Sequence, residues 1–148
     1  MAEKTKRAGP NNLGYLQVMD PSPERARERV VEAVKHGMQG DLKEMEVYLL
    51  KAIRADEKNP DAHRFLADLH LLNRNSNPEG EKVAVGKAIA EYEKAIALDP
   101  SNPHNYFGLS EAYAVKGDEE RRKEYLKGYL GRVASPKGVD RLPFPKTS

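Results

Sequence analysis

The chain has 148 residues, of which 32% are charged and 39% hydrophobic, and this balance is typical of one helix-rich domain with a small core. It contains no cysteine, which excludes disulfides, thiolate zinc sites and cysteine nucleophiles. No apolar run approaches the ~20 residues that cross a bilayer, and the first ten residues lack a signal-peptide core. We therefore expect a cytoplasmic protein without a membrane span.

The formal net charge of +2 is small, although residues 116–148 carry nine basic and five acidic residues. Such an end attracts acidic surfaces, but the charges are too mixed to indicate nucleic acid binding. A solvated helix face followed by a basic tail accounts for the pattern.

Residues 1–22 predict an extended tail, because prolines and glycine interrupt them at Pro10, Gly14 and Pro21. The tail nevertheless carries a cluster of apolar side chains, namely Leu13, Tyr15, Leu16, Val18 and Met19. A disordered, solvent-exposed tail rarely carries so many apolar residues. We expect Tyr15, Leu16 and Met19 to dock on a partner or on the protein's own flank, and the alternative is a frayed tail.

A first helix pair is predicted over residues 23–59. Ser22 and Pro23 are typical of a helix start, and the helix should run to about His36. Its apolar stripe comprises Val30, Ala33, Val34 and Gly37. After a turn at Gly40 and Asp41, the partner helix should bury Leu42, Met45, Leu49, Ala52 and Ile53.

A second pair is predicted over residues 60–102, with a loop at residues 73–82, which are rich in Asn, Pro and Gly. The helix after the loop has apolar residues at intervals of three and four. These residues are Ala88, Ile89, Tyr92, Ala95, Ile96 and Leu98. Pro100 should end this helix.

A third pair is predicted over residues 103–133. Pro103 suits a first helical turn, and Tyr106, Leu109, Tyr113 and Ala114 form the apolar stripe that follows. After a turn at Gly117 and Asp118, a basic helix carries Tyr125 and Gly128. Residues 134–148 should be extended, and the prolines around Leu142 and Phe144 make a stiff apolar plug there.

The alternation of small and large residues resembles the tetratricopeptide repeat (TPR). The match runs Ala88-x3-Tyr92-x2-Ala95-x4-Pro100 and continues as Tyr106-x2-Leu109-Ser110-x2-Tyr113. His63 and His70 occupy the aromatic positions of the preceding repeat. The resemblance implies an all-α, short right-handed solenoid of three helix pairs. The family's period of 34 residues makes the segment 73–82 an insertion, which either binds a partner or is merely tolerated.

The resemblance further implies that the first helix of each pair lines a concave groove for another polypeptide. The family's inward-facing positions correspond here to Arg27, Val30, Val34, Arg64, Asp68, Leu71, His104, Phe107, Glu111 and Ala114. Among these, Phe107 and Leu71 would be apolar anchors and Arg64 a charged one. Some family members grip a chaperone's terminal carboxylate with Lys, Asn and Arg. The matching positions here hold Val30, Val34, Phe65, His104 and Gly108, which disfavours a chaperone co-factor.

The sequence carries no motif for catalysis, cofactor or metal. Residues 80–88 resemble a P-loop, but five residues separate Gly80 from Gly86 and Ala88 stands where Ser or Thr binds magnesium. His63 and His70 would lie ~10 Å apart along a helix, which is too far to share one metal. We expect no enzyme, no metal and no cofactor.

Three functions remain open. The first is a non-enzymatic adaptor or assembly factor that binds a partner polypeptide through the groove and the tails. The second is a permanent structural subunit of a larger complex, with tails that wrap its neighbours. The third is a self-assembling scaffold, in which the tail of one copy enters the groove of the next.

Overall fold

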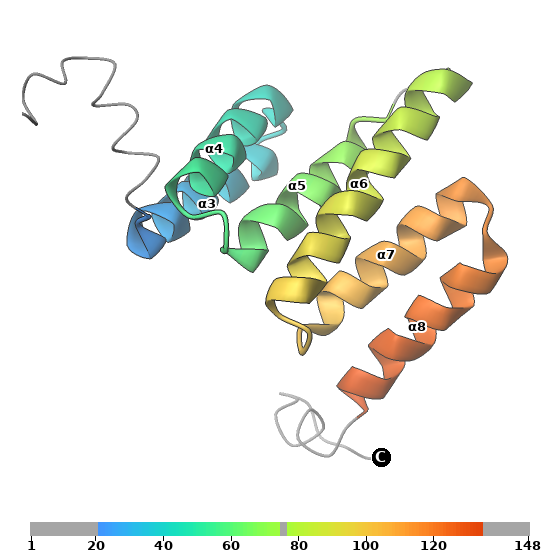
Figure 1. Ribbon diagram of the computed structural model, residues 1–148. Coiled ribbons are helices and arrows are strands. Elements are labelled where there is room, and N and C mark those ends of the chain that lie inside the picture. The colour runs from blue at the N-terminus through green and yellow to red at the C-terminus, as the bar shows by residue number, and fades with distance from the viewer. Residues whose placement is uncertain (1–20, 75–76, 135–148) are drawn as a thin grey trace, which may run out of the picture. The chain divides into compact units, whose positions relative to one another are not determined.

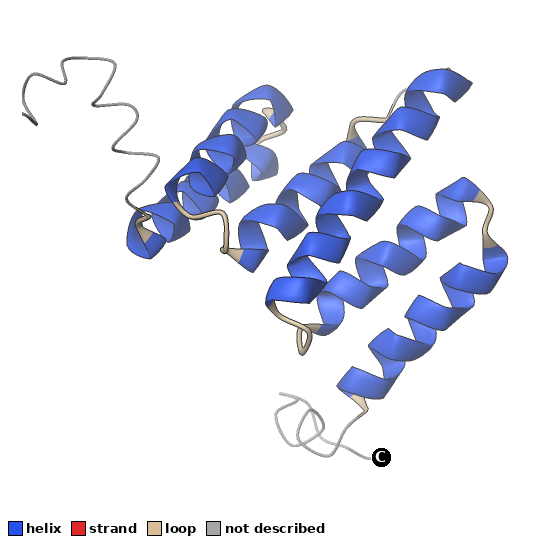
Figure 2. Cartoon of the chain, in the orientation of Figure 1, coloured by secondary structure: helices blue, strands red, loops and turns tan. Residues whose placement is uncertain are grey.

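The computed structural model describes residues 21–74 and 77–134, which form six helices joined by short loops (Figures 1 and 2). The helices are α3 (Pro23–Met38), α4 (Leu42–Ala55), α5 (Pro60–Leu72), α6 (Pro78–Leu98), α7 (Pro103–Lys116) and α8 (Glu119–Val133). No strand occurs in these residues. The all-α class predicted from the sequence is confirmed, whereas the tail residues Tyr15, Leu16, Met19, Leu142 and Phe144 lie outside the described ranges.

The chain divides into two compact units, residues 1–62 and 63–148, and the boundary falls in the first turn of α5. In the first unit, α3 and α4 form a helix pair. Ser22 caps α3 by accepting a hydrogen bond from the Arg25 amide at 3.2 Å, as predicted. Gly40, with φ of 82°, turns the chain into α4, where Met45, Leu49 and Ala52 are buried as expected.

The second unit consists of the rest of α5 with α6, α7 and α8. Ala88, Tyr92 and Ala95 of α6 are all buried, which confirms the prediction that small and large residues alternate on its packed face. Ala88 and Tyr92 belong to one core cluster with Ala67 of α5 and with Leu109, Ala112 and Tyr113 of α7. Two details of the predicted stripes are wrong, because Leu98 and Ala114 are exposed.

The loop expected over residues 73–82 is shorter than predicted. Asn77 caps α6 by accepting from the Gly80 amide at 2.8 Å, and Pro78 occupies the first turn. A proline is well suited to that position because its missing N–H has no helical partner there. Residues 78–82 of the predicted insertion therefore belong to α6, which has 21 residues, whereas α7 has 14.

Helix α8 is the last described helix of the second unit, and none of its residues is buried. Arg132 binds it to the α6–α7 turn, because its Nε donates to the Pro100 carbonyl at 2.9 Å and its Nη2 to the Tyr106 hydroxyl at 2.8 Å. The guanidinium also lies 3.6 Å from the centroid of the Tyr106 ring, a cation–π contact. Gly128 lets this helix approach, since a Cβ there would lie 3.2 Å from the Tyr106 ring.

Candidate functional site

Tyr92 crosses the space between α5 and α7 and organises the predicted groove residues of the second unit. Its hydroxyl donates a short hydrogen bond to Asp68 of α5. Its ring lies against Gly108 of α7, where an added Cβ would be 2.3 Å from Tyr92 Cε1. The close approach of ring and backbone requires glycine at position 108.

Ionisable side chains from α5 and α7 interact with this hydroxyl or with Asp68. Arg64 Nη1 lies 3.8 Å from Asp68 Oδ2, and the two side chains are 18% and 37% exposed. His104 acts electrostatically on Asp68, and Glu111 acts on Tyr92. Four of the predicted groove residues, Arg64, Asp68, His104 and Glu111, thus lie close together, and we call them the charged face.

Burial raises the pKa of Asp68, although the Tyr92 hydroxyl, Arg64 and His104 each act to lower it. The same environment raises the pKa of Tyr92, first by burial and then by the negative charge of Asp68. The fold thus holds a carboxylate where its charge is poorly solvated yet partly open to a ligand. Perturbed groups of this kind are enriched at functional sites.

The two predicted apolar anchors differ in their surroundings. Leu71 is half-buried and packs against the core cluster of the second unit. Phe107 is 41% exposed, and its ring centroid lies 5.2 Å from that of Tyr129 on α8. Of the two side chains, Phe107 is therefore the more exposed.

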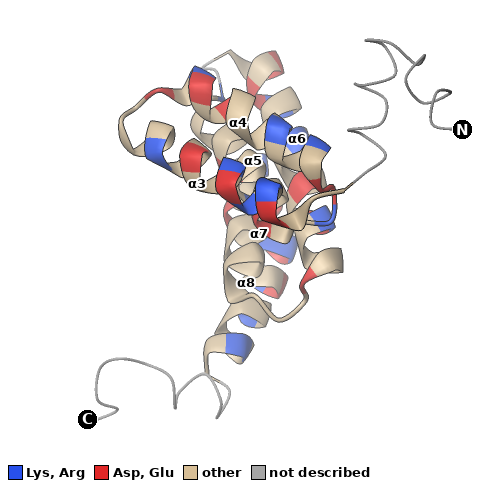
Figure 3. Cartoon of the chain, turned by 90° about the vertical axis from the view of Figure 1, so that its left-hand side faces the viewer, with Lys and Arg blue, Asp and Glu red and all other residues tan. Residues whose placement is uncertain are grey.

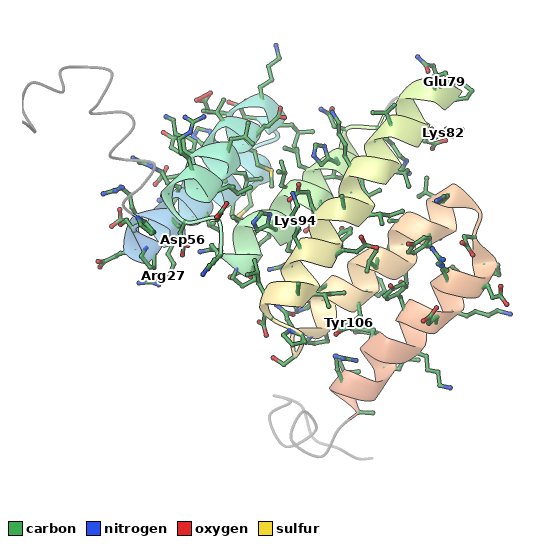
Figure 4. All side chains as sticks on the ribbon, in the orientation of Figure 1. Arg27, Asp56, Glu79, Lys82, Lys94 and Tyr106 are labelled. Carbon is green, nitrogen blue, oxygen red and sulfur yellow. The ribbon has the colours of Figure 1, made fainter. Side chains whose placement is uncertain are left out.

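Three of the predicted groove positions lie on α3, in the first unit. Arg27 is exposed on α3 (labelled in Figure 4). Val30 is buried on α3, as expected for its apolar stripe. Val34 is half-buried.

Sequence reasoning missed several polar contacts of the site. His63 fills a buried aromatic position as predicted, but its Nδ1 also lies 2.7 Å from Glu91 Oε1 on α6. Burial would raise the pKa of Glu91, yet hydrogen bonds from His63 and Lys94 outweigh it and lower that pKa. A signal for the Tyr92 contact was present, since a glycine within a helix, such as Gly108, is costly unless a close approach requires it.

The described residues can be compared with the P-loop and the metal sites that were considered from the sequence. Residues 80–88 lie within α6, so they do not form a phosphate-binding loop. Across residues 21–74 and 77–134, no three His, Cys, Asp or Glu side chains gather as metal ligands would.

Acidic and basic residues are interspersed along α3 (Figure 3) rather than separated by sign. Among the helices of the described ranges, none combines the length and apolar character that crossing a membrane requires.

Comparisons with known proteins agree with this architecture. Residues 85–117 match the sequence model of the TPR repeat. This matched segment, which is similar to a tetratricopeptide repeat, comprises residues 85–98 of α6 and all of α7. No curated protein matches the sequence.

Among solved structures, the chain is similar to one described as the crystal structure of MamA protein. The two share 22% sequence identity with a TM-score of 0.62, and the match covers 84% of this chain. The chain spans only 63% of that structure's length. At this identity the likeness shows a shared helical-repeat fold.

Proposed function

We propose that this protein is a non-enzymatic adaptor that binds a partner polypeptide on the charged face of α5 and α7. The observation that carries the proposal is Asp68, a carboxylate held partly out of water by Tyr92 and Arg64 but still 37% exposed on its side chain. A carboxylate in this position lowers the stability of the fold, because burial disfavours its ionised form. A role of Asp68 in binding a partner would explain why the carboxylate is present.

The surroundings of Asp68 support a polypeptide partner. Arg64 and His104 supply donors, Asp68 and Glu111 supply acceptors, and exposed Phe107 supplies an apolar contact on the same helix as His104. Backbone amides and carbonyls need both kinds of hydrogen-bonding group, whereas a purely cationic ligand would need only acceptors. The TPR match at residues 85–117 agrees, since repeat stacks of this kind present extended binding surfaces.

The test is affinity purification from the native source followed by mass spectrometry. The double variant Arg64→Glu with Phe107→Ala should lose a partner that wild type recovers. The matched control is Lys87→Glu with Leu98→Ala, which changes the same kinds of side chain at exposed positions of α6. Equal recovery of every partner by the two double variants would refute binding at the charged face.

The same preparations separate the other proposed roles. A monomer at high concentration in size-exclusion chromatography excludes a self-assembling scaffold. Co-purification that resists high salt at a fixed stoichiometry favours a permanent subunit, because transient contacts between charged surfaces weaken as salt screens them.

A further inference from the structure

A second candidate binding surface lies at the N-terminal end of α6. A cavity of about 400 Å³ is formed between the N-terminal part of α6 and the C-terminal end of α7. Pro78, Val85 and Gly86 line it from α6, and Val115 lines it from α7. None of these residues belongs to the charged face.

The cavity depends on the added length of α6. Residues 78–84 precede the segment matched as a TPR repeat, and Val83 in this part is 56% exposed. Figure 4 labels Glu79 and Lys82 on this extension. Val85 is buried and is one of the residues that line the cavity, so this end of the extension is packed instead of projecting freely.

The rim of the cavity carries an excess of positive charge. Glu81 also lines it, but its Oε2 lies 3.4 Å from Arg74 Nε and its charge is thereby matched. Lys82 and Lys116 line the cavity from α6 and α7, and both are exposed. Neither forms an ion pair within the part of the chain that the structure describes. The Lys116 ammonium instead lies 5.8 Å from the Tyr113 ring centroid, at the outer limit of a cation–π contact.

We propose that this cavity binds an acidic segment of a partner polypeptide. One apolar side chain of that segment enters between Val85 and Val115, and acidic residues before and after it pair with Lys82 and Lys116. The two lysines come from the two helices that form the cavity, which fits carboxylates on both sides of the anchor. The cavity volume lies in the range of sites that enclose small groups, and its apolar floor with few polar groups at the rim is typical of such sites.

The direct test uses the full chain and short labelled peptides in fluorescence anisotropy. The probe is Gly-Ser-Glu-Leu-Glu-Ser-Gly, acetylated and amidated so that only its side chains carry charge. One comparison peptide has Gln in place of both Glu residues, and a second has Ser in place of Leu. The first peptide should bind most tightly, and its affinity should fall as salt rises. Equal binding of the three peptides, or binding of none at about 1 mM, would overturn the proposal.

Variants locate the binding. Gly86→Phe should abolish binding by filling the cavity, and an added Cβ at Gly86 meets nothing within 4 Å. Its control is Gly131→Phe, since a Cβ at this glycine of α8 also meets open space. Lys82→Glu and Lys116→Glu should each weaken binding about three- to tenfold, because each replaces an attraction by a repulsion. Lys87→Glu, exposed on α6 but outside the cavity, should leave the affinity unchanged.

The result that contradicts the site is unchanged affinity in both lysine variants. These positions are exposed, so the variants remain informative even where Gly86→Phe lowers the melting temperature. A last peptide ends in Leu with a free carboxylate and lacks Glu, and it tests whether the cavity binds a chain terminus instead of an internal acidic segment. Preferential binding of that peptide would show that the lysines receive a chain terminus, and would overturn the internal acidic segment. The double variant at Arg64 and Phe107 should bind the first peptide normally, which separates this site from the charged face.

Discussion

The two halves of α6 show how one helix is divided between packing and display. Residues 87–98 bury Ala88, Tyr92 and Ala95 against neighbouring helices, and we call them the packed half. In residues 78–86, the extension, only Val85 is buried. The difference arises from neighbours, since both halves have helical backbones with the same hydrogen bonding. Substitutions of the same kind should therefore have very different effects in the two halves.

The largest expected effect is removal of the Tyr92 side chain. Tyr92→Ala should destabilise the fold by about 3–5 kcal/mol, because it leaves a large cavity in the core of the second unit. Val83→Ala in the extension should change stability by less than about 0.5 kcal/mol, since Val83 is mostly exposed. Urea unfolding followed by circular dichroism measures both. Similar losses in the two variants would show that the extension is packed after all.

The second comparison adds a methyl group instead of removing a ring. Gly108→Ala should destabilise the fold by about 1–3 kcal/mol, because its Cβ would overlap the Tyr92 ring. Gly86→Ala should stabilise it by about 0.5–1 kcal/mol, because its Cβ meets open space and alanine favours a helix. A stabilising Gly108→Ala would mean that Tyr92 does not lie against α7.

These contacts also show what the sequence predicts and what it leaves open. The spacing of Ala88, Tyr92 and Ala95 predicts their burial, because helical periodicity needs no knowledge of the neighbours. His63 on α5 and Glu91 on α6 are 28 residues apart in sequence, so their pairing depends on the register in which the two helices meet, and no local pattern specifies that register.

The start of α6 was mispredicted for a different reason. The sequence places Pro78 in a loop, although the preference of proline for a first helical turn correctly predicts the helices at Pro23 and Pro103. The surrounding Asn and Gly residues of 73–82 outweighed it. The same preference, applied to Pro78, predicts the extension. The gathering of Arg64, Asp68, His104 and Glu111 was expected from the family resemblance, but the role of the Tyr92 hydroxyl at their centre required the structure.

The third prediction concerns the dependence of stability on pH through Glu91, whose side chain is 15% exposed beside His63. Because its pKa is lowered in the fold from an ordinary value of 4.5, Glu91 contributes stability that is present above that pH and lost as pH falls through the lowered pKa. Glu91→Gln should cost about 1–2 kcal/mol at pH 7, as loss of a charge-assisted hydrogen bond does. Urea midpoints of wild type and variant should converge between pH 5 and about 3. Parallel curves would contradict the assigned pKa shift.

The smallest effect on stability is expected at Asp68, and its sign is opposite. Burial raises the pKa of Asp68 from its ordinary value of 3.8, so its neutral form fits the fold better, and wild type loses stability as pH rises through the raised pKa. Asp68→Asn keeps an oxygen that accepts from Tyr92 but carries no charge. The variant should therefore equal or exceed wild type in stability at pH 7, by less than about 1 kcal/mol, and the advantage should vanish at pH 3.

The same Asp68→Asn variant should recover less of the partner that binds the charged face. A substitution that maintains stability while it lowers binding identifies a charge kept for function, because selection for stability alone would remove it. Melting curves at pH 3 and pH 7, run beside the affinity purification, measure both properties on one preparation. Loss of stability together with loss of the partner would instead assign Asp68 a structural role, in which its carboxylate serves to hold Tyr92 between α5 and α7.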